Sequence, residues 1–329
     1  MLDVRDLRVT FRSGSGTVTA VDGLDLRVAP GEVLGVVGES GSGKSVSMMS
    51  ILGLLRGPNT TVTGTANFRG ADLLAMSDQQ LRQVRGRHIA MIFQDPMTAL
   101  TPVYTVGWHI AEQLRAHTSM SRSRAKARAI ELLDAVGIPN AARRVSAYPH
   151  ELSGGMRQRA VIAMALSCNP ALLIADEPTT ALDVTTQAQI LDLLRNLQRE
   201  HSSAIIMITH DIGVVSTLAD RVVVMYGGKP VEEGSRREVF RTARHPYTRG
   251  LLASVPRIDG PSVDMLAAIP GMPPSLSDLP TGCRFAPRCS HQFDRCDEQP
   301  ALAGATSHRA ACWLTVEEAA ARPATEGLR

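Results

Sequence analysis

Short apolar runs recur along the first 235 residues and alternate with stretches in which apolar residues return every three or four positions. Uninterrupted apolar runs of four or five residues predict strands that are covered on both faces. They occupy residues 33–37, 89–93, 172–175, 204–208 and 222–226. Helical periods occupy residues 46–55, 122–136, 156–167 and 186–200. Strands that alternate with helices in this way predict an α/β fold.

Composition narrows the class of protein. The 329 residues are 44% apolar and 20% charged with a net charge of +3, which is typical of a folded chain and excludes a bulk polyanion binder. No apolar run reaches the roughly 18–20 residues of a membrane span, and no apolar segment follows the N-terminus as in a secretory signal. Five cysteines, an odd number, favour a reducing compartment over a disulfide framework. We therefore expect a protein that is cytosolic or peripheral on the cytosolic side of a membrane.

The proline and cysteine content of the chain changes near residues 234–238. Residues 1–235 hold 9 prolines and one cysteine, whereas residues 236–329 hold 10 prolines and four cysteines. We expect a first domain over residues 1–235 and a smaller extension over residues 236–329. The lone cysteine of the first part, Cys168, ends an apolar helical stretch and is interpreted as ordinary core.

A glycine-rich loop follows the first apolar run. Its sequence, Gly38-Glu39-Ser40-Gly41-Ser42-Gly43-Lys44-Ser45, fits the phosphate-loop pattern G-x-x-x-x-G-K-[ST] between a predicted strand and a predicted helix. Glycines let successive N–H groups turn toward a phosphate, and the helix N-terminus adds partial positive charge. Lys44, one of only three lysines in the chain, would bridge the β- and γ-phosphates, and Ser45 would ligate Mg²⁺. The predicted ATP contacts are Gly38, Ser40, Gly41, Ser42, Gly43, Lys44, Ser45 and Val46.

Two acids end another buried strand. In the run 171–178 the apolar residues are followed by Asp176 and Glu177, at the edge of a parallel sheet where ligands bind. Asp176 would hold Mg²⁺, and Glu177 would polarise the attacking water. Together with the loop, these acids predict a nucleoside triphosphatase.

Four further motifs occur in a characteristic order. Leu152-Ser153-Gly154-Gly155-Met156-Arg157-Gln158 resembles the signature of ATP-binding cassette (ABC) proteins. Gln94 resembles the family's Q-loop glutamine, a contact for Mg²⁺ and water. Ala181-Leu182-Asp183 resembles the D-loop, and His210 resembles the switch histidine.

The resemblance implies an ABC cassette, a P-loop NTPase fold with a RecA-like core and a helical subdomain at about residues 95–165. In that family the signature caps ATP bound to a second subunit, so Ser153, Gly154, Gly155 and Asp183 would complete a site across an interface. Glu177, His210 and Gln94 would be the catalytic residues. Adenine would stack on Phe11 if the turn at 13–16 loops out, and otherwise on aliphatic residues such as Val18.

The extension carries its own candidate site. Cys283, Cys289, Cys296 and Cys312 form C-x5-C-x6-C-x15-C, which lacks the C-x2-C pairs of zinc ribbons. Four thiolates suit either zinc or an iron–sulfur centre, and the spacing leaves both open.

A second resemblance covers about residues 2–315. The run 282–289, the segment beginning His245-Pro246-Tyr247 and the stretch 94–107 are similar to ATP-binding subunits of oligopeptide/dipeptide permeases. Met156 is typical of the D-type subunit in such heterodimers, whereas Thr101 replaces the family's usual Asn and would alter the Q-loop turn. The resemblance implies ATP and Mg²⁺ as cofactors and a 4Fe–4S cluster on the four cysteines.

The same resemblance implies the partners. They are a second, F-type cassette, two transmembrane permease subunits that contact residues 94–109, and an extracytoplasmic substrate-binding protein, with no nucleic acid. The chain would then power peptide import at the cytoplasmic face of the inner membrane. The alternatives are a soluble ABC ATPase acting on nucleic acid or ribosomes, and a regulatory module with vestigial ATP binding. One cassette, no heptad run and intact catalytic positions argue against both.

Overall fold

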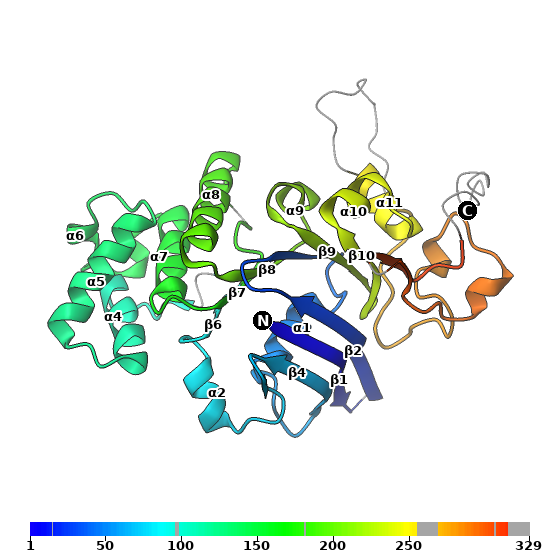
Figure 1. Cartoon of the computed structure of the whole chain (residues 1–329), viewed down its shortest axis with the longest axis horizontal. Helices are drawn as coiled ribbons and strands as arrows, with labels where there is room; N and C mark the ends of the chain where they lie inside the picture. Colours follow the sequence, from blue (N-terminus) through cyan, green and yellow to red (C-terminus); the bar gives the residue numbers. More distant parts are fainter. Residues whose placement is uncertain (15, 96–98, 181, 255–268, 306, 315–329) are drawn as a thin grey trace. The chain divides into compact units, whose positions relative to one another are not determined.

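The computed structural model describes residues 1–14, 16–95, 99–180, 182–254, 269–305 and 307–314 (Figure 1). Two compact units divide the chain. Unit 1 comprises Met1, Val28–Val33 and Ala75–Ile208, and unit 2 comprises Leu2–Arg27, Leu34–Leu74 and Thr209–Arg329. None of the helices in the described ranges combines the length and apolarity that crossing a bilayer requires.

Unit 1 is built on parallel strands with helices after them. Strands β6 (Ile89–Ile92), β7 (Leu172–Asp176) and β8 (Ala204–Thr209) pair in parallel, with Ile89 opposite Leu172 and Leu172 opposite Ala204. Its helices are α2 (Asp78–Val84), α4 (Val106–His117), α5 (Arg122–Ala135), α6 (Ala141–Arg144), α7 (Gly154–Leu166) and α8 (Val184–His201). Helices α4, α5 and α7 pack on one another, and α6 lies beside α5 (Figure 1). These four helices lie between residues 106 and 166, and the helical subdomain at about residues 95–165 stays a prediction.

Unit 2 holds strands of two sheets. The first sheet has the order β2-β1-β4-β5, formed by β1 (Leu2–Ser13), β2 (Gly16–Val28), β4 (Thr60–Phe68) and β5 (Ala71–Asp72). The second set follows the order β3-β9-β10-β12-β11, formed by β3 (Val33–Val37), β9 (Arg221–Tyr226), β10 (Lys229–Ser235), β12 (His308–Ala310) and β11 (Ala303–Ala305). Strands β3 and β9 are parallel, and the others pair antiparallel. The helices are α1 (Lys44–Ile51), α9 (Ile212–Leu218), α10 (Arg236–Arg241) and α11 (Pro246–Ala253), with short 3₁₀ turns at Ala286–Arg288 and Asp294–Asp297.

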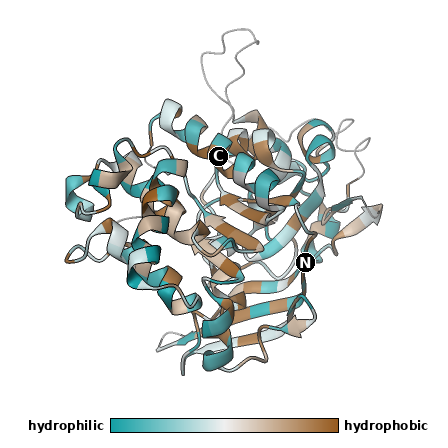
Figure 2. Cartoon of the chain, turned by 60° about the vertical axis from the view of Figure 1, so that its left-hand side comes forward, coloured by the Kyte–Doolittle hydropathy of each residue, from teal (hydrophilic) through white to brown (hydrophobic). Residues whose placement is uncertain are grey.

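The apolar runs lie where their pattern predicts. All five predicted strands are present within a residue or two at each end, and β3 and β7 are buried along their whole length. Figure 2 shows the apolar residues concentrated on these strands, while the helices are mixed in hydropathy. The α/β fold expected from the sequence is therefore confirmed.

The extension joins the core of unit 2. Strand β12 of the extension pairs with β10, which ends at Ser235, where the sequence predicts a domain boundary. Phe285 and Cys289 of the extension belong to the same buried cluster as Val37 and Tyr226. Within unit 2, the two parts share one core. The domain division at 235 stays a prediction.

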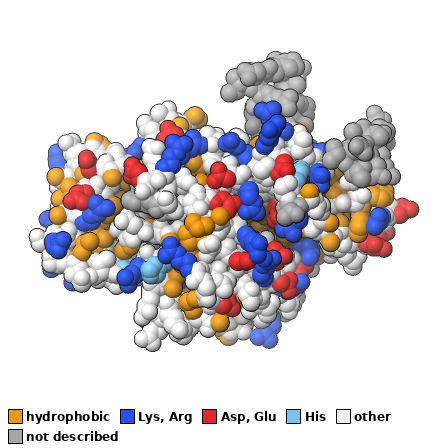
Figure 3. All heavy atoms as spheres, in the orientation of Figure 1, with side chains coloured by type: hydrophobic (Ala, Val, Ile, Leu, Met, Phe, Trp, Pro, Cys, Tyr) orange, Lys and Arg blue, Asp and Glu red, His pale blue; other side chains and the backbone are white. Residues whose placement is uncertain are grey.

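Acidic and basic side chains are interspersed on the face of the molecule that Figure 3 shows. On the face in Figure 3, Lys and Arg side chains lie among Asp and Glu side chains, without one large basic patch. This distribution fits the net charge of +3.

Candidate active site

The glycine-rich loop of unit 2 connects β3 to α1 and encloses its lysine. Lys44 is buried, and its Nζ donates to the backbone oxygens of Gly38 (2.7 Å) and Glu39 (2.8 Å). Gly43 caps α1 with φ +96°, and a Cβ there would lie 2.5 Å from the backbone oxygen of Ala20, so only glycine fits. No side chain caps the start of α1, and the partial positive charge of a helix N-terminus favours an anion there. This arrangement suits a bound phosphate.

The predicted residues 38–43 form the loop, and residues 44–46 already belong to α1, which begins at Lys44, two residues before the predicted start. Ser47 was missed by the sequence reasoning. Its hydroxyl is buried and donates to the backbone oxygen of Gly43 at 2.8 Å, which ties the loop to the first turn of α1. No part of the phosphate-loop pattern signals this residue.

The two acids of unit 1 differ in setting. Asp176 is the last residue of β7 and is buried. Glu177 has φ +48°, a left-handed conformation that is unusual for a non-glycine residue, and its N–H donates to the backbone oxygen of Ile208 at 2.8 Å. Asp176 therefore lies in the extended strand, whereas Glu177 lies in a left-handed turn directly after it.

The Glu177 carboxylate is held by neighbours of unit 1. Its Oε2 accepts hydrogen bonds from Gln94 Nε2 and Thr180 Oγ1, both at 2.9 Å. The structure therefore brings together two residues that the sequence predicts as catalytic from positions 83 apart. Thr180 was missed, and only its place three residues after the acid could have indicated it. Two donors on one oxygen restrict the carboxylate to one orientation.

The signature lies at the start of helix α7, and the N-terminal end of this helix is exposed. Ser153 caps α7 by accepting the N–H of Met156 at 3.3 Å, and Ser153 and Gly154 are both exposed. Gln158 of the same helix is buried, and its Nε2 donates to the backbone oxygen of Pro178 at 2.6 Å. This bond links the signature helix to the residue that follows Glu177. The signature pattern includes Gln158 but does not reveal this contact.

The D-loop residue Asp183 caps α8. Its carboxylate accepts the N–H of Thr186 at 2.9 Å and the hydroxyl of Thr186 at 2.7 Å, and these bonds lower the pKa of Asp183 below its usual value. Val184, the next residue, is 85% exposed. An apolar side chain this exposed next to the signature helix is available to a partner. Ala181 of the predicted D-loop lies outside the described residues.

His210 and Phe11 belong to unit 2. His210 follows β8 and is exposed, while Asp211 caps α9 by accepting the N–H groups of Gly213 (2.8 Å) and Val214 (3.3 Å). Phe11 lies in β1 opposite Thr60, and the link from β1 to β2 is only two residues long. Residue 15 of this link lies outside the described residues. The choice between Phe11 and Val18 for adenine stacking therefore remains a prediction.

The Q-loop region of unit 1 is ordered by a histidine. His109 is buried, its Nδ1 lies 2.9 Å from the backbone oxygen of Thr105, and its Nε2 accepts the N–H of Thr101 at 2.9 Å. Thr101 contributes through its backbone, which any residue supplies, so the replacement of the usual Asn leaves this bond intact. Residues 96–98 of this stretch lie outside the described residues.

The four cysteines of the extension line one cavity. Cys283, Cys289, Cys296 and Cys312 meet there, together with rings such as those of Phe285 and Trp313. Burial, with the other three thiols nearby, raises the pKa of Cys289 to about 12. Within the described part of the chain, however, no group of three or more His, Cys, Asp or Glu side chains is placed so that it could hold a metal ion. Four cysteine thiols are a donor set that suits a thiolate-ligated group, but here they share a cavity without being placed as metal ligands.

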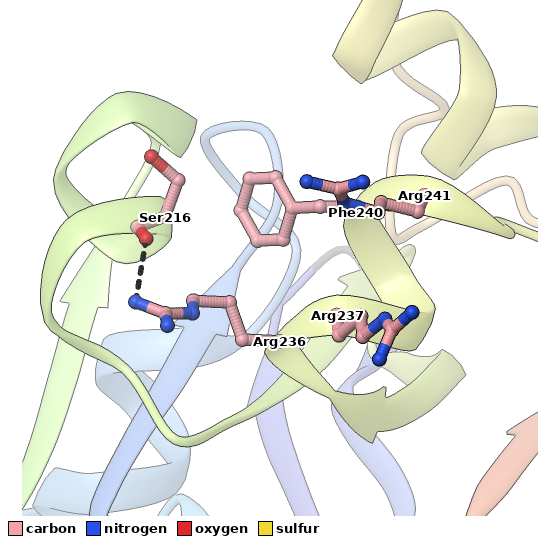
Figure 4. Close-up of a pocket in the computed structure, with 5 residues that line it drawn as sticks. All are labelled: Ser216, Arg236, Arg237, Phe240 and Arg241. Carbon is pink, nitrogen blue, oxygen red and sulfur yellow. Dashed lines mark hydrogen bonds between the residues drawn. The ribbon is translucent and has the colours of Figure 1, made fainter.

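A separate hollow in unit 2 is lined by Ser216, Arg236, Arg237, Phe240 and Arg241 (Figure 4). Arg236 Nη1 donates to the backbone oxygens of Ser216 (3.0 Å) and Thr217 (3.4 Å), so this guanidinium ties α10 to α9. These five residues are not among the predicted site residues.

Comparison with known proteins gives consistent matches. Residues 21–180 match the ABC transporter family, and residues 231–296 match the family described as oligopeptide/dipeptide transporter, C-terminal region. A putative peptide import ATP-binding protein of Brucella melitensis is 52% identical, over 98% of both chains. The oligopeptide transport ATP-binding protein OppD of Salmonella typhimurium is 51% identical, over 97% of this chain and 95% of the relative.

Solved structures agree on the fold. A dimeric post-hydrolysis state of the ATP-binding cassette MJ0796, bound to ADP and Pi, matches with a TM-score of 0.65 at 30% identity, covering 72% of this chain and 99% of that one. The structure of cbiO1 from Clostridium perfringens, part of an ABC transporter complex, matches with a TM-score of 0.62 at 29% identity, covering 73% of this chain and 90% of that one.

Proposed function

This chain belongs to the ATP-binding subunits of oligopeptide/dipeptide ABC transporters, and we propose that it supplies one of two cassettes that pair to form shared ATP sites. Its activity is ATP hydrolysis coupled to peptide import, at the cytoplasmic face of the inner membrane. Relatives that match over nearly the whole chain and act in peptide transport favour this function over a soluble ATPase acting on nucleic acid or ribosomes.

The observation that carries the pairing is the exposure of the signature. Ser153 and Gly154 stand uncovered at the start of α7, where helix N–H groups attract an anion. The exposed Val184 beside the D-loop supports the same interface. A second cassette would therefore place its bound γ-phosphate against this helix, and this cassette would receive the partner's signature in return. The F-type identity of the partner remains part of the proposal.

Within each shared site, the loop from Gly38 to Ser45 would cradle the phosphates, and the buried ammonium of Lys44 would neutralise them. Ser45, Gln94 and Asp176 carry the hard oxygen atoms that Mg²⁺ prefers, and they would hold it. When bound, the ion would neutralise charge on the β- and γ-phosphates. His210 would contact the γ-phosphate.

Glu177 would accept the proton of the attacking water. Its carboxylate is oriented by Gln94 and Thr180, and so is positioned before substrate arrives. In the assembled transporter, Glu177→Gln should reduce ATP turnover by about 10²–10⁴-fold, the usual contribution of a general base, while ATP-dependent pairing of the cassettes persists. Stopped-flow ATPase and size-exclusion measurements test this, with Glu200→Gln, a change in α8 outside the site, as the control. Wild-type hydrolysis in Glu177→Gln would show that another group is the base.

The permease contact is proposed at the Q-loop region. Tyr104 and Trp108 are both more than a third exposed, and their rings stack with centroids 3.8 Å apart, next to the exposed Val103. Exposed large apolar side chains gathered in this way indicate an interaction surface. Short cytosolic helices of two permease subunits would dock there, and a substrate-binding protein would deliver peptide from outside.

The four cysteines are proposed to hold a 4Fe–4S cluster. Four thiols that line one cavity, two of them buried and two partly buried, are the donor set such a cluster uses, and loading would replace their protons. Its role would be to stabilise the extension. In the chain purified without oxygen, Cys289→Ser should remove the visible absorbance of an iron–sulfur centre and lower the melting temperature, whereas Cys168→Ser should change neither. If Cys289→Ser left both readouts unchanged, the cluster would be refuted.

A further inference from the structure

An arginine of the cysteine-rich segment forms a two-point ion pair with the phosphate loop. Arg288 Nη1 lies 2.7 Å from Glu39 Oε2, and Arg288 Nη2 lies 3.1 Å from Glu39 Oε1. Glu39 is the second residue of the loop, and Arg288 immediately precedes Cys289. The Arg288 side chain is only 7% exposed. A paired, buried guanidinium fixes its carboxylate in both position and orientation.

Arg288 is itself held from several sides. Its Nε donates to the backbone oxygen of Pro270 at 2.8 Å, and its Nη1 donates to the hydroxyl of Tyr226 at 3.2 Å. Burial alone would lower the pKa of Arg288, but its bonds to Glu39 and Tyr226 raise that pKa above the ordinary value, so the side chain stays charged. The guanidinium is therefore a rigid part of the extension, with little freedom to follow a moving loop.

Glu39 connects this arginine to the phosphate-binding lysine. The N–H of Glu39 donates to the hydroxyl of Tyr247 at 2.8 Å, and its carbonyl oxygen accepts Lys44 Nζ at 2.8 Å. The backbone donor, the backbone acceptor and the side chain of one residue are thus all engaged. A displacement of Glu39 would displace the ammonium of Lys44 with it.

A second arginine of the same segment reaches the other side of the loop. Arg284, which follows Cys283, donates to the carboxylate of Asp22 and the backbone oxygen of Gly227. The next residue, Gly228, donates its N–H to the backbone oxygen of Ser42 at 3.1 Å. Each arginine adjoins a cysteine, so the segment from Cys283 to Cys289 braces the loop at two points.

The segment between the two arginines is anchored in the core. Phe285 is buried, with ring centroids 5.2 Å from Tyr226 and 5.4 Å from Tyr247. The N–H of Cys283 donates to the backbone oxygen of Cys296 at 2.9 Å. The position of the arginines therefore depends on the local fold around the four cysteines.

We propose that Arg288 is a positioning residue of the ATP site, which transmits the fold of the four-cysteine segment through Glu39 to Lys44. The proposal rests on the proposed function of the loop as the phosphate-binding element. It assigns to the extension a part in nucleotide affinity, in addition to any contribution to stability.

The expected effect is on binding more than on turnover. The loop contacts phosphates both before and during the reaction, so loosening it removes interactions common to the ground and transition states. Arg288→Ala should raise the KM for ATP and the Kd of a fluorescent ATP analogue about tenfold and change kcat by less than about twofold. Arg288→Lys, which keeps the charge and one hydrogen bond, should restore affinity to within about threefold of wild type.

The matched control is Arg309→Ala. Arg309 also makes an ion pair from the extension to the core, to Glu233 Oε1 at 2.6 Å and 2.9 Å, but it joins β12 to β10. The Arg309→Ala variant should lower the melting temperature, as Arg288→Ala does, but should leave the affinity for ATP unchanged. All variants are measured as the full chain, for analogue binding and melting, and in the assembled transporter, for KM and kcat.

A double-mutant cycle gives the decisive result. If Arg288 acts through Glu39, then Glu39→Gln and Arg288→Ala each weaken binding, and the double variant is no weaker than the worse single variant. If Arg288→Ala does not fold, Arg288→Lys and Glu39→Gln still test the same link. Wild-type affinity in Arg288→Ala or Glu39→Gln, or fully additive effects, would overturn the proposal. Lys44→Ala distinguishes a failure of this proposal from a failure of the loop's proposed function. Wild-type affinity for ATP in Lys44→Ala would refute the loop's function as the phosphate-binding element.

Discussion

Gln158 of the signature helix provides a sharp test of how unit 1 aligns its two motifs. Its side chain is 3% exposed, and its Nε2 donates to the backbone oxygen of Pro178 at 2.6 Å. Gln158→Met keeps the length and volume of the side chain but removes the hydrogen-bond donor. The buried backbone carbonyl of Pro178 then loses its partner. A buried polar group that loses its partner costs about 1–3 kcal/mol.

That range predicts a measurable loss of stability. About 2 kcal/mol corresponds to a fall in melting temperature of about 4–8 °C for a domain of 150–250 residues. Because Pro178 follows Glu177 directly, the carboxylate should also shift, and a displacement of about 1 Å can reduce turnover by up to about 10²-fold. We expect a decrease of about tenfold in kcat, with little change in analogue binding.

Differential scanning calorimetry of the full chain and ATPase rates of the assembled transporter measure the two effects. Gln189→Met is the matched control, because Gln189 accepts a hydrogen bond from Arg159 at an exposed site and should change the free energy of unfolding by less than about 0.5 kcal/mol. If Gln158→Met had the melting temperature and the kcat of wild type, the hydrogen bond between the signature helix and the Glu177 turn would contribute to neither stability nor turnover. That result would refute the prediction.

Two further predictions concern stability. Phe285→Ala removes a buried ring that contacts Tyr226 and Tyr247. It should lower the free energy of unfolding by about 3–5 kcal/mol, measured by thermal unfolding. A decrease below about 1 kcal/mol would show that the extension is not part of the core. Burial lowers the pKa of His109 below its ordinary value of 6.5, so the folded chain keeps this side chain neutral. As the pH falls below 6.5, the unfolded chain binds a proton at this residue before the folded chain does. The free energy of unfolding therefore decreases as the pH falls. Melting curves from pH 7 to 5.5 should decline less steeply for His109→Gln than for wild type, and equal slopes would contradict this assignment.

The local motifs could be predicted because their physics is local. A phosphate loop needs consecutive backbone N–H groups and glycines in left-handed conformations, and both are written in adjacent residues such as Gly41 and Gly43. Strands β3, β7 and β8 are buried on both faces, so they appear as unbroken apolar runs. The sequence analysis therefore identified these elements and their order.

The sheet of β1, β2 and β4 was not predicted. Its strands are long and only partly buried, as in the pattern of β4, where most residues are exposed or half-buried. Polar and charged residues interrupt their apolar positions, and a half-exposed strand gives a weaker hydropathy signal than a covered one. Pairing between β1 and β4 depends on tertiary packing more than on either segment alone.

The sequence by itself determined the chemistry available to this protein: the phosphate loop, the paired acids, the signature and the four cysteines, since each depends on residues close together in the chain. Only the tertiary structure decided which of them meet. Gln94 reaches Glu177 across 83 positions, and Arg288 reaches Glu39 across 249. Periodicity reports which side chains are buried, but a contact between distant segments depends on how the chain closes around its core, and no local pattern encodes that closure.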